Sequence, residues 1–262
     1  MSTPLKISIV TPSYNQGRYL ADAVESVAEQ NYPHVEHIIL DAQSTDETLE
    51  VLGRYSHLEH LRWVSEPDDG QTDAINKGFQ QATGDIVAWL NADDYYLPGT
   101  FAKVAQAFTD CPATDIIYGE AAFVDADKNV TGYRRGHSFD YQVLLYYSCY
   151  IQSTATFLRR HIIDEGHLLV PSYKVTMDLE YYVRLAQLGF RYKFIPEIFA
   201  GFRWHGENVS TVHNDVRLRE RRQVVKQYGF QVPEPFEDAA YKLAAHVIRL
   251  KRLGRRVIER RL

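Results

Sequence analysis

The 262-residue sequence predicts an α/β protein of three layers, in which a mostly parallel sheet lies between two layers of helices. Two observations predict this class. Short apolar runs alternate along the first hundred residues with segments whose apolar positions recur at helical spacing. Polar residues that include carboxylates directly follow several of these runs, and such residues collect at the carboxyl ends of strands, where α/β sheets bind ligands.

The first half of the chain contains the clearest alternation of strand and helix. The predicted strands span 6–11, 35–40, 61–64 and 86–90. Helices are predicted after Gly17, after the Ser-Thr-Asp-Glu start at 44–47, and from about 72 to 82. Strands that alternate with helices pair in parallel through right-handed crossovers. We therefore expect a parallel sheet in this half.

Residues after 98 form less regular patterns, and 134–205 are rich in aromatic side chains. The predicted elements are a helix to Phe108, strands at 115–118 and 154–158, a hairpin turn at 127–129 and a helix at 179–187. The last segment is predicted to be mostly helical. Its apolar stripe consists of Phe236, Ala240, Leu243, Val247, Leu250 and Val257.

The end of the chain is basic, although the net charge of the whole chain is −5. Residues 217–262 hold 13 Lys and Arg against 5 Asp and Glu. This asymmetry favours an anionic partner, and membrane lipid is preferred over nucleic acid. A solvated basic helix and a dimerisation helix are alternative uses of the same residues.

The two cysteines, Cys111 and Cys149, stand in no metal or redox spacing, which favours a reduced cytoplasmic setting. The N-terminus enters a strand without the pattern of a signal peptide. No window reaches 18 apolar residues. We expect a cytoplasmic protein that does not span a membrane and that contacts its inner face through the basic tail.

A candidate cation site follows the fourth predicted strand, at Asn91-Ala92-Asp93-Asp94. Two adjacent carboxylates at the end of a buried strand raise at least one pKa unless a cation lies beside them. Oxygen ligands at this place suit Mg²⁺ or Mn²⁺ together with a phosphate-bearing ligand. A helix N-cap near Pro98 explains one aspartate but not both. Divalent cation binding is therefore the preferred interpretation.

Three segments together resemble the ordered motifs of family 2 glycosyltransferases. They are Thr11-Pro12-Ser13-Tyr14-Asn15, Asp41-Ala42-Gln43-Ser44-Thr45-Asp46-Glu47-Thr48 and Asn91-Ala92-Asp93-Asp94. The resemblance covers about residues 5–210 and implies the GT-A fold, a three-layer α/β/α architecture. It implies a GT-A domain at 1–210, with a nucleotide-binding half at about 1–120 and an acceptor-binding half at about 121–210, and then a basic helical extension at 211–262.

The resemblance also implies which residues bind the nucleotide. They are Thr11, Tyr14, Asn15, Asp41, Asp73, Lys77, Asn91, Ala92 and Asp94. Asp41 would accept the imide N–H of uracil or thymine, and Asn15 would approach the base or ribose. Turn chemistry is the alternative for Asn15. The family commonly has Gly-Gly where this chain has Ala42-Gln43.

Asp73 and Lys77 are four residues apart on a predicted helix, so they lie on one face. By resemblance this face points at the nucleotide, with Lys77 beside a phosphate or a base carbonyl. A surface ion pair is the alternative.

The metal ligands implied by the resemblance are Asp93 and His205. Asn91 stands at the first position of the family's Asp-x-Asp pattern and would bond a ribose hydroxyl. Asp94 would support Asp93 or take its place. His205 belongs to a segment, 202–210, that resembles one in which a histidine approaches the metal or the diphosphate; an ordinary surface histidine is the alternative.

The catalytic base implied by the resemblance is Asp178, because an inverting transfer needs a base to deprotonate the acceptor hydroxyl. The N-cap of the following helix is the alternative role for Asp178. Glu180 is the reserve candidate, and the helix dipole otherwise explains its position. Acceptor recognition should fall to residues 134–175.

The implied activity is an inverting, bacterial polysaccharide-type glycosyltransferase that depends on Mn²⁺ or Mg²⁺. It would move a hexose or N-acetylhexosamine from a nucleotide-diphosphate-sugar donor to a saccharide or lipid-linked saccharide, in cell-surface polysaccharide or glycoconjugate synthesis. Two other classes stay open. A nucleotidyltransferase also uses carboxylates and Mg²⁺, although the first loop has only one glycine, Gly17, and one basic residue, Arg18. The third class is a non-catalytic nucleotide- or glycan-binding module.

Overall fold

The structure is a computed structural model that describes residues 4–206, 208, 213–231, 233, 239, 241, 243–248 and 250. The strands are β1 (Ile7–Ser13), β2 (Val35–Asp41), β3 (Leu61–Ser65), β4 (Ile86–Trp89), β5 (Tyr95–Tyr96), β6 (Ile116–Val124), β7 (Val130–Arg134), β8 (Thr156–Arg159) and β9 (Tyr192–Arg203). The helices are α1 (Gly17–Ala28), α2 (Thr48–Arg54), α3 (Gln71–Gln81), α4 (Thr100–Asp110), α5 (His161–Asp164), α6 (Met177–Gln187) and α8 (Asn214–Tyr228). Two further short helices are a π-helix, η1 (Val143–Tyr147), and a 3₁₀-helix, η2 (Ser153–Ala155).

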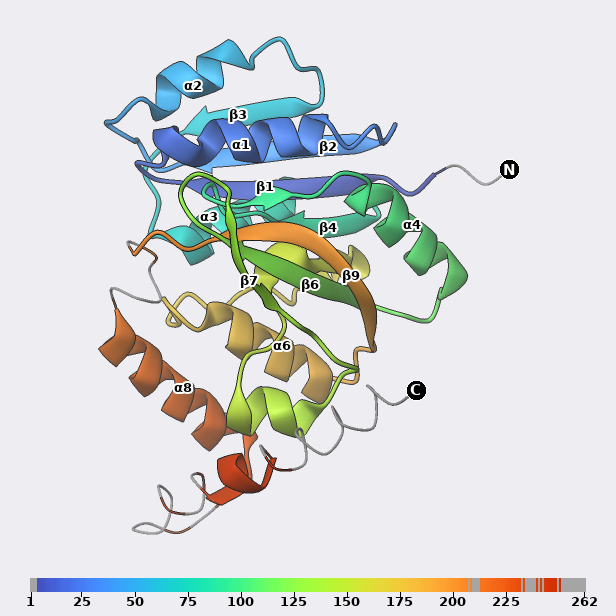
Figure 1. The fold of residues 1–262 in the computed structure, drawn as a ribbon, viewed down its shortest axis with the longest axis vertical. Helices are drawn as coiled ribbons and strands as arrows, with labels where there is room; N and C mark the ends of the chain where they lie inside the picture. Colours follow the sequence, from blue (N-terminus) through green and yellow to red (C-terminus); the bar gives the residue numbers. More distant parts are fainter. Residues whose placement is uncertain are drawn as a thin grey trace.

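All the described strands belong to one sheet, with the order β3-β2-β1-β4-β8-β6-β9-β5 and with β7 paired to β6. The pairs β1–β2, β1–β4 and β2–β3 are parallel, as predicted for the first half (Figure 1). The second half is mixed, because β8 enters antiparallel between β4 and β6, whereas β9 is parallel to β6. The three-layer α/β architecture is confirmed, and the sheet is less parallel than predicted.

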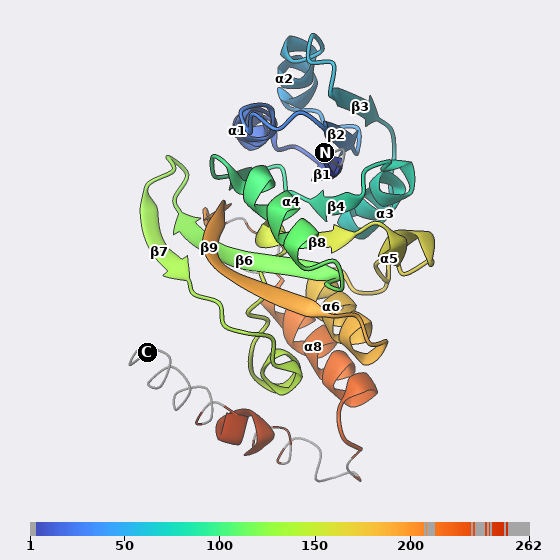
Figure 2. The ribbon, with the colours of Figure 1, turned by 90° about the vertical axis from the view of Figure 1, so that its right-hand side faces the viewer.

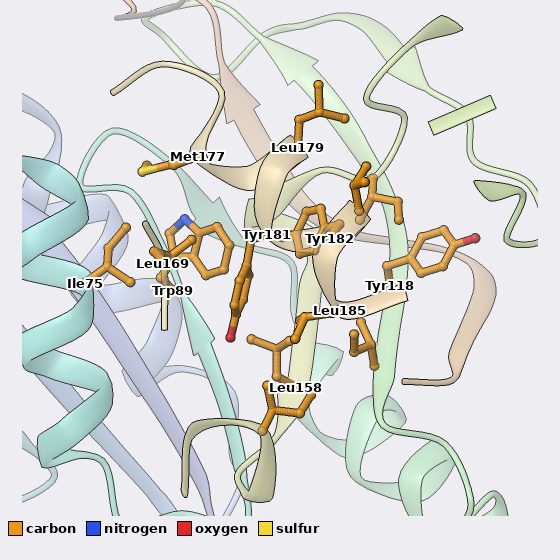
Figure 3. Close-up of a cluster of buried hydrophobic side chains, with 14 of the residues drawn as sticks. Ile75, Trp89, Tyr118, Leu158, Leu169, Met177, Leu179, Tyr181, Tyr182 and Leu185 are labelled. Atoms are coloured by element: carbon orange, nitrogen blue, oxygen red, sulfur yellow. The ribbon is translucent and has the colours of Figure 1, made fainter. Parts of the chain in front are cut away.

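Each face of the sheet is covered by a different set of helices (Figure 2). Alternate side chains of β1 and β4, such as Ile9 and Ala88, pack with α1 and α4. The intervening residues Val10 and Trp89 pack with α3 and α6. Figure 3 shows Trp89 between Ile75 of α3 and Tyr181 of α6. The alternation follows from the pleat, which sends successive side chains to opposite faces.

Helix α3 lies very close to the sheet because Gly78 faces it. A Cβ at Gly78 would lie 2.3 Å from Val10 Cγ1 and 3.1 Å from Leu40 Cδ2. The absence of a side chain here therefore sets the spacing between α3 and strands β1 and β2.

The sequence analysis missed strands β5 and β9. Strand β9 contains Pro196, a residue type that is uncommon inside strands, and half-buried or exposed residues over its first part. The predicted hairpin turn at 127–129 is confirmed, since β6 and β7 pair antiparallel on either side of it.

The basic tail begins with α8, which packs against α6 and η1. Of the predicted apolar stripe, Leu243, Val247 and Leu250 are exposed. Phe236, Ala240 and Val257 lie outside the described residues. Among the described helices, none combines the length and the apolar character that a membrane crossing requires.

Candidate active site

A cleft of about 1130 Å³ opens at the carboxyl ends of β1, β2 and β4 and continues to α6 and α8. Of the predicted site residues, those that line it are Tyr14, Asn91, Ala92, Asp93 and Asp178. Those that the described lining does not include are Thr11, Asn15, Asp41, Asp73, Lys77, Asp94, Glu180 and His205. Residues that follow β1, β2 and β4 therefore line one cleft, whereas Asn15 and Asp41 themselves are not among the described lining residues.

The loops after β1 and β2 are joined to each other by hydrogen bonds. Asn15, at φ 51°, accepts a bond from the Thr45 amide through Oδ1 at 2.9 Å, and its own amide donates to Ser44 Oγ at 2.8 Å. These bonds match the alternative interpretation of Asn15, in which its side chain stabilises a turn. Gln43 adopts φ 55°, a left-handed backbone conformation that is uncommon for residues other than glycine, and it lines the cleft.

Asp41 ends β2 as predicted, and it is buried. Its carboxylate accepts bonds from the Ser44 amide at 3.0 Å, from Ser44 Oγ at 2.5 Å and from Ser65 Oγ at 2.6 Å. These bonds fix the loop after Asp41, and Ala42 and Gln43 of this loop line the cleft. A direct contact between Asp41 and a base stays a prediction.

Thr11 is fully buried in β1, and its hydroxyl bonds His37 Nε2 at 2.9 Å. Thr11 therefore supports the sheet and does not face the cleft. Tyr14 is 62% exposed at the cleft, which leaves its ring available to a ligand.

Asp73 and Lys77 form the ion pair that the helical spacing allowed, with Nζ and Oδ2 3.0 Å apart. The hydrogen bond from Lys77 lowers the pKa of Asp73, and the same bond raises the pKa of Lys77. Both side chains are partly exposed, so the pair contributes little to stability. A role beside the nucleotide stays a prediction for both.

Asp93 and His205 meet at the cleft, with Oδ2 and Nε2 3.0 Å apart. Adjacent ligands of a six-coordinate ion lie about 3 Å apart when each is about 2.1 Å from the ion, so the pair fits a divalent cation. His205 also stacks on Tyr19 of α1, at 5.0 Å between ring centroids. Among the described residues, no group of three or more His, Cys, Asp or Glu is placed to hold an ion. Further ligands would have to come from a phosphate or water.

Asp94 points away from the cleft into the protein, where it is 1% exposed. Its oxygens accept bonds from the Arg203 amide at 2.8 Å, from Thr154 Oγ1 at 2.6 Å and from Asn91 Nδ2 at 3.1 Å. Burial, and then the charge of Asp93, raise the pKa of this carboxyl. Asp93 is thus the carboxylate of the pair that faces the cleft.

Arg203 is a site residue that the sequence analysis missed. Its buried guanidinium donates to the Asp93 carbonyl at 2.7 Å, to the Ala126 carbonyl at 2.5 Å and to Asp22 Oδ2 at 2.6 Å. It lies two residues before His205, in a segment where only the histidine drew attention. A buried arginine needs several acceptors at once, and these come from loops that only the fold brings together.

Asp178 lines the cleft from the first turn of α6. Cys149 Sγ donates to its Oδ2 at 3.7 Å, and burial raises the pKa of the carboxyl. Asp178 is not the N-cap, because α6 starts at Met177 and Thr176 holds the cap position. Glu220 of α8 instead accepts bonds from the amides of residues 174–176. The N-cap alternative for Asp178 is therefore wrong.

Glu180 lies on the buried face of α6, away from the described lining of the cleft. Its oxygens accept bonds from Arg184 at 2.8 and 3.1 Å and from Tyr228 Oη at 2.6 Å. This network joins α6 to α8. A structural role accounts for Glu180.

A comparison with protein families identifies the family of this chain. Residues 8–167, more than half of the chain, match the family described as Glycosyl transferase family 2. The chain belongs to this family.

Curated relatives include a putative teichuronic acid biosynthesis glycosyltransferase of Bacillus subtilis, 27% identical, over 78% of this chain and 81% of the relative. A PGL/p-HBAD biosynthesis glycosyltransferase of Mycobacterium bovis is 31% identical over 70% of each chain. An uncharacterized glycosyltransferase of Nostoc is 27% identical, and this chain spans 66% of its length.

Solved structures confirm the fold. S. aureus TarS 1-349 in complex with UDP-GlcNAc has a TM-score of 0.67 and 18% identity, covering 92% of this chain and 70% of that one. The mannosyltransferase PcManGT of Pyrobaculum calidifontis, in complex with GDP-Man and Mn²⁺, has a TM-score of 0.66 and 18% identity, covering 94% and 70%. The predicted GT-A fold is therefore correct.

Proposed function

We propose that the protein transfers a sugar, with inversion, from a nucleotide-diphosphate-sugar donor to a saccharide or lipid-linked saccharide. The observation that carries this proposal is that Asp93, paired with His205, and Asp178 line one cleft from separate elements. Asp93 is suited to bind a cation that holds a diphosphate. Asp178 is suited to accept a proton. The teichuronic acid and PGL/p-HBAD biosynthesis roles in the names of the relatives support a place in the synthesis of cell-surface glycans.

Asp178 takes the proton of the acceptor hydroxyl as that oxygen attacks the anomeric carbon, and the bond from this carbon to the diphosphate breaks. Burial raises the pKa of Asp178, which strengthens it as a base. Asp93 and His205 would hold Mn²⁺ or Mg²⁺. When bound, such an ion stabilises the charge that develops on the leaving diphosphate. Tyr14 and Gln43 would contact the nucleotide, and the donor sugar would be a hexose or N-acetylhexosamine.

Paired substitutions test these two roles separately. Asp93→Asn should remove the extra thermal stabilisation that UDP or GDP gives in the presence of Mn²⁺, because ligand binding raises apparent stability by mass action. Asp178→Asn should retain this stabilisation and lose transfer. Asp110→Asn, an exposed position on α4, is the control and should retain both. Normal turnover by Asp178→Asn would reject the base assignment, and the anomeric configuration of the product, read by NMR, tests inversion.

Donor hydrolysis without acceptor separates an enzyme from a non-catalytic binding module. We expect slow hydrolysis of a nucleotide sugar that EDTA abolishes and Mn²⁺ restores. Binding without hydrolysis or transfer to any acceptor would favour the binding module. Membership of a glycosyltransferase family favours sugar transfer over nucleotidyl transfer.

We also propose that the tail holds the enzyme at the cytoplasmic face of an anionic membrane. The exposed Leu243, Val247 and Leu250 offer apolar contacts, and the tail's excess of Lys and Arg offers electrostatic attraction. The chain should sediment with phosphatidylglycerol vesicles and not with phosphatidylcholine vesicles. Deletion of 237–262 should abolish this binding, and unchanged sedimentation of the deletion variant would reject the proposal.

A further inference from the structure

Three arginines are among the residues that line the cleft. Arg134 ends β7, and Arg217 and Arg221 lie one turn apart on α8; all three line the cleft. We refer to Arg134, Arg217 and Arg221 as the arginine cluster. Arg217 and Arg221 were not predicted as site residues, because the sequence analysis assigned the arginines after 216 to a basic tail, and Arg134 was covered only by the predicted acceptor range 134–175.

The arginine cluster is held by neutral acceptors. Arg134 Nη2 donates to Ser148 Oγ at 3.0 Å and to the Cys149 carbonyl at 2.6 Å. Arg217 Nη2 donates to Asn214 Oδ1 at 2.6 Å, and Arg221 Nη2 lies 3.5 Å from the Leu145 carbonyl. Within the described ranges, no carboxylate lies within 4.0 Å of these guanidinium nitrogens. None of the ion pairs among the described residues therefore neutralises the charge of the arginine cluster.

Two arginines outside the cluster are paired with carboxylates. Arg203 pairs with Asp22 at 2.6 Å, and Arg184 pairs with Glu180 at 2.8 Å. Arg134 and Arg221 both donate to carbonyls of the segment 145–149, and Arg217 is one turn from Arg221. Three like charges that line one cleft repel each other, and a bound anion relieves this repulsion. Guanidinium groups bind phosphate and carboxylate oxygens with two parallel hydrogen bonds, which gives such a site geometric selectivity.

The arginine cluster lies beside the proposed base. Cys149 connects the two, because its carbonyl accepts from Arg134 and its thiol donates to Asp178. Helix α8 lies at the opposite end of the molecule from β2 and β3, whose following loops line the proposed nucleotide end of the cleft (Figure 1). The acceptor hydroxyl must approach Asp178, so a group bound to the cluster belongs to the acceptor.

On the basis of the proposed function, we infer that the acceptor saccharide carries an anionic group, a phosphate or a carboxylate, which the arginine cluster binds next to the reacting hydroxyl. Neutral saccharides of the same size would lack this contact. The anion would thus select the acceptor and orient its hydroxyl towards Asp178.

Binding of glucose, glucuronate and glucose 6-phosphate, measured by NMR titration in EDTA, tests this inference. EDTA prevents phosphate from binding through a metal at Asp93. Wild type should bind at least one anionic sugar about tenfold more tightly than glucose. A stronger preference for glucose 6-phosphate indicates a phosphate group, and a stronger preference for glucuronate indicates a carboxylate.

Two double variants of α8 provide the matched comparison. Arg217→Gln with Arg221→Gln should abolish the preference. Arg219→Gln with Arg222→Gln removes the same charge from exposed positions of the same helix that the described cleft lining does not include, and it should retain the preference. Equal binding of neutral and anionic sugars by wild type, or equal losses in both double variants, would overturn the inference.

Donor binding distinguishes this inference from the proposed function. With Mn²⁺ present, the variant at Arg217 and Arg221 should bind UDP or GDP as wild type does. Weaker nucleotide binding in this variant alone would assign the arginine cluster to the donor diphosphate and overturn the inference. If wild type itself neither binds nor turns over any nucleotide sugar, the proposed function fails, whatever the anionic sugars do.

Discussion

Arg203 and Asp93 are joined by a hydrogen bond of 2.7 Å from the arginine Nε to the aspartate carbonyl oxygen. The same guanidinium reaches Asp22, and the Arg203 amide donates to Asp94. Strand β9, helix α1 and the loop after β4 are therefore fixed to one another by a single side chain. The bond from Arg203 to Asp93 uses only the backbone carbonyl of Asp93. It thus fixes the backbone at Asp93 so that the side-chain carboxylate faces the cleft, and it does not engage the carboxylate oxygens.

Arg203→Lys should destabilise the protein by about 3 kcal/mol, because a lysine cannot serve three separate acceptors and breaking a buried pair has this magnitude. Mn²⁺-dependent binding of UDP or GDP should weaken with it. Urea unfolding and nucleotide titration measure the two effects. Arg191→Lys is the control, since Arg191 is 63% exposed in its pair with Asp115, and it should change stability by less than about 1 kcal/mol. Equal effects of the two substitutions would contradict this account of Arg203.

His205→Gln should raise the Mn²⁺ concentration needed for nucleotide binding, because glutamine removes the imidazole that pairs with Asp93 at 3.0 Å. We expect about a tenfold change, the scale on which substitutions around a metal alter its affinity. Isothermal titration of UDP at several Mn²⁺ concentrations measures this change. His34→Gln, at an exposed position, should leave the Mn²⁺ requirement unchanged. Wild-type Mn²⁺ dependence in His205→Gln would remove this residue from the proposed ligands.

Gly78→Ala should destabilise the protein by about 1–3 kcal/mol, because the new methyl group overlaps Val10 at 2.3 Å. Gly53→Ala supplies the opposite case on α2, where a Cβ meets no atom within 4 Å. It should stabilise the protein by up to about 1 kcal/mol through helix propensity. Chemical unfolding of both variants tests the close approach of α3 to the sheet, and a neutral Gly78→Ala would disprove it.

His37 should make the protein less stable as the pH falls. Burial, and then the charge of His60, lower the pKa of His37 from 6.5 to about 3. The unfolded chain therefore binds a proton below about pH 6.5 while the folded chain does not, so stability is lost as pH falls from there towards 3. Between about pH 7 and about pH 5 the loss from this group is about 2 kcal/mol.

His37→Gln should reduce this pH dependence, which unfolding curves at both pH values will measure. The His37→Gln variant should be less stable than wild type at neutral pH, because its bond to Thr11 is altered. This offset does not affect the comparison, which concerns how steeply the free energy of unfolding changes with pH. His34→Gln is again the control, because His34 is exposed. An unchanged slope in His37→Gln would show that other groups cause the acid sensitivity.

The sequence predicted the parallel half of the fold because its signals are local. Strand and helix periods, and turn residues between them, are complete within the first hundred residues. The same holds for Asp93, which ends a recognisable strand. The second half could not be predicted in this way, since β8 and β9 obtain their places from partners distant in sequence.

The missed site residues depend on tertiary contacts. Arg203 is interpretable only when β9 brings it to Asp22 and Asp93, which are far away along the chain. Arg217 and Arg221 resembled other tail arginines until α8 packed beside the cleft. Asp41 and Asn15 were correctly placed at strand ends, whereas their hydrogen bonds within the loops required the folded backbone.

Glu220 has a practical consequence for anyone who shortens this protein. Its buried carboxylate holds the amides of residues 174–176, immediately ahead of Asp178. A chain cut before α8 lacks Glu220, so the loop at residues 174–176 would be released and sugar transfer would be lost. This loss would occur whether or not the tail binds a membrane. A chain cut after Tyr228 keeps the hydrogen bonds of Glu220. Only such a variant can separate the effect of the tail on membrane binding from its effect on sugar transfer.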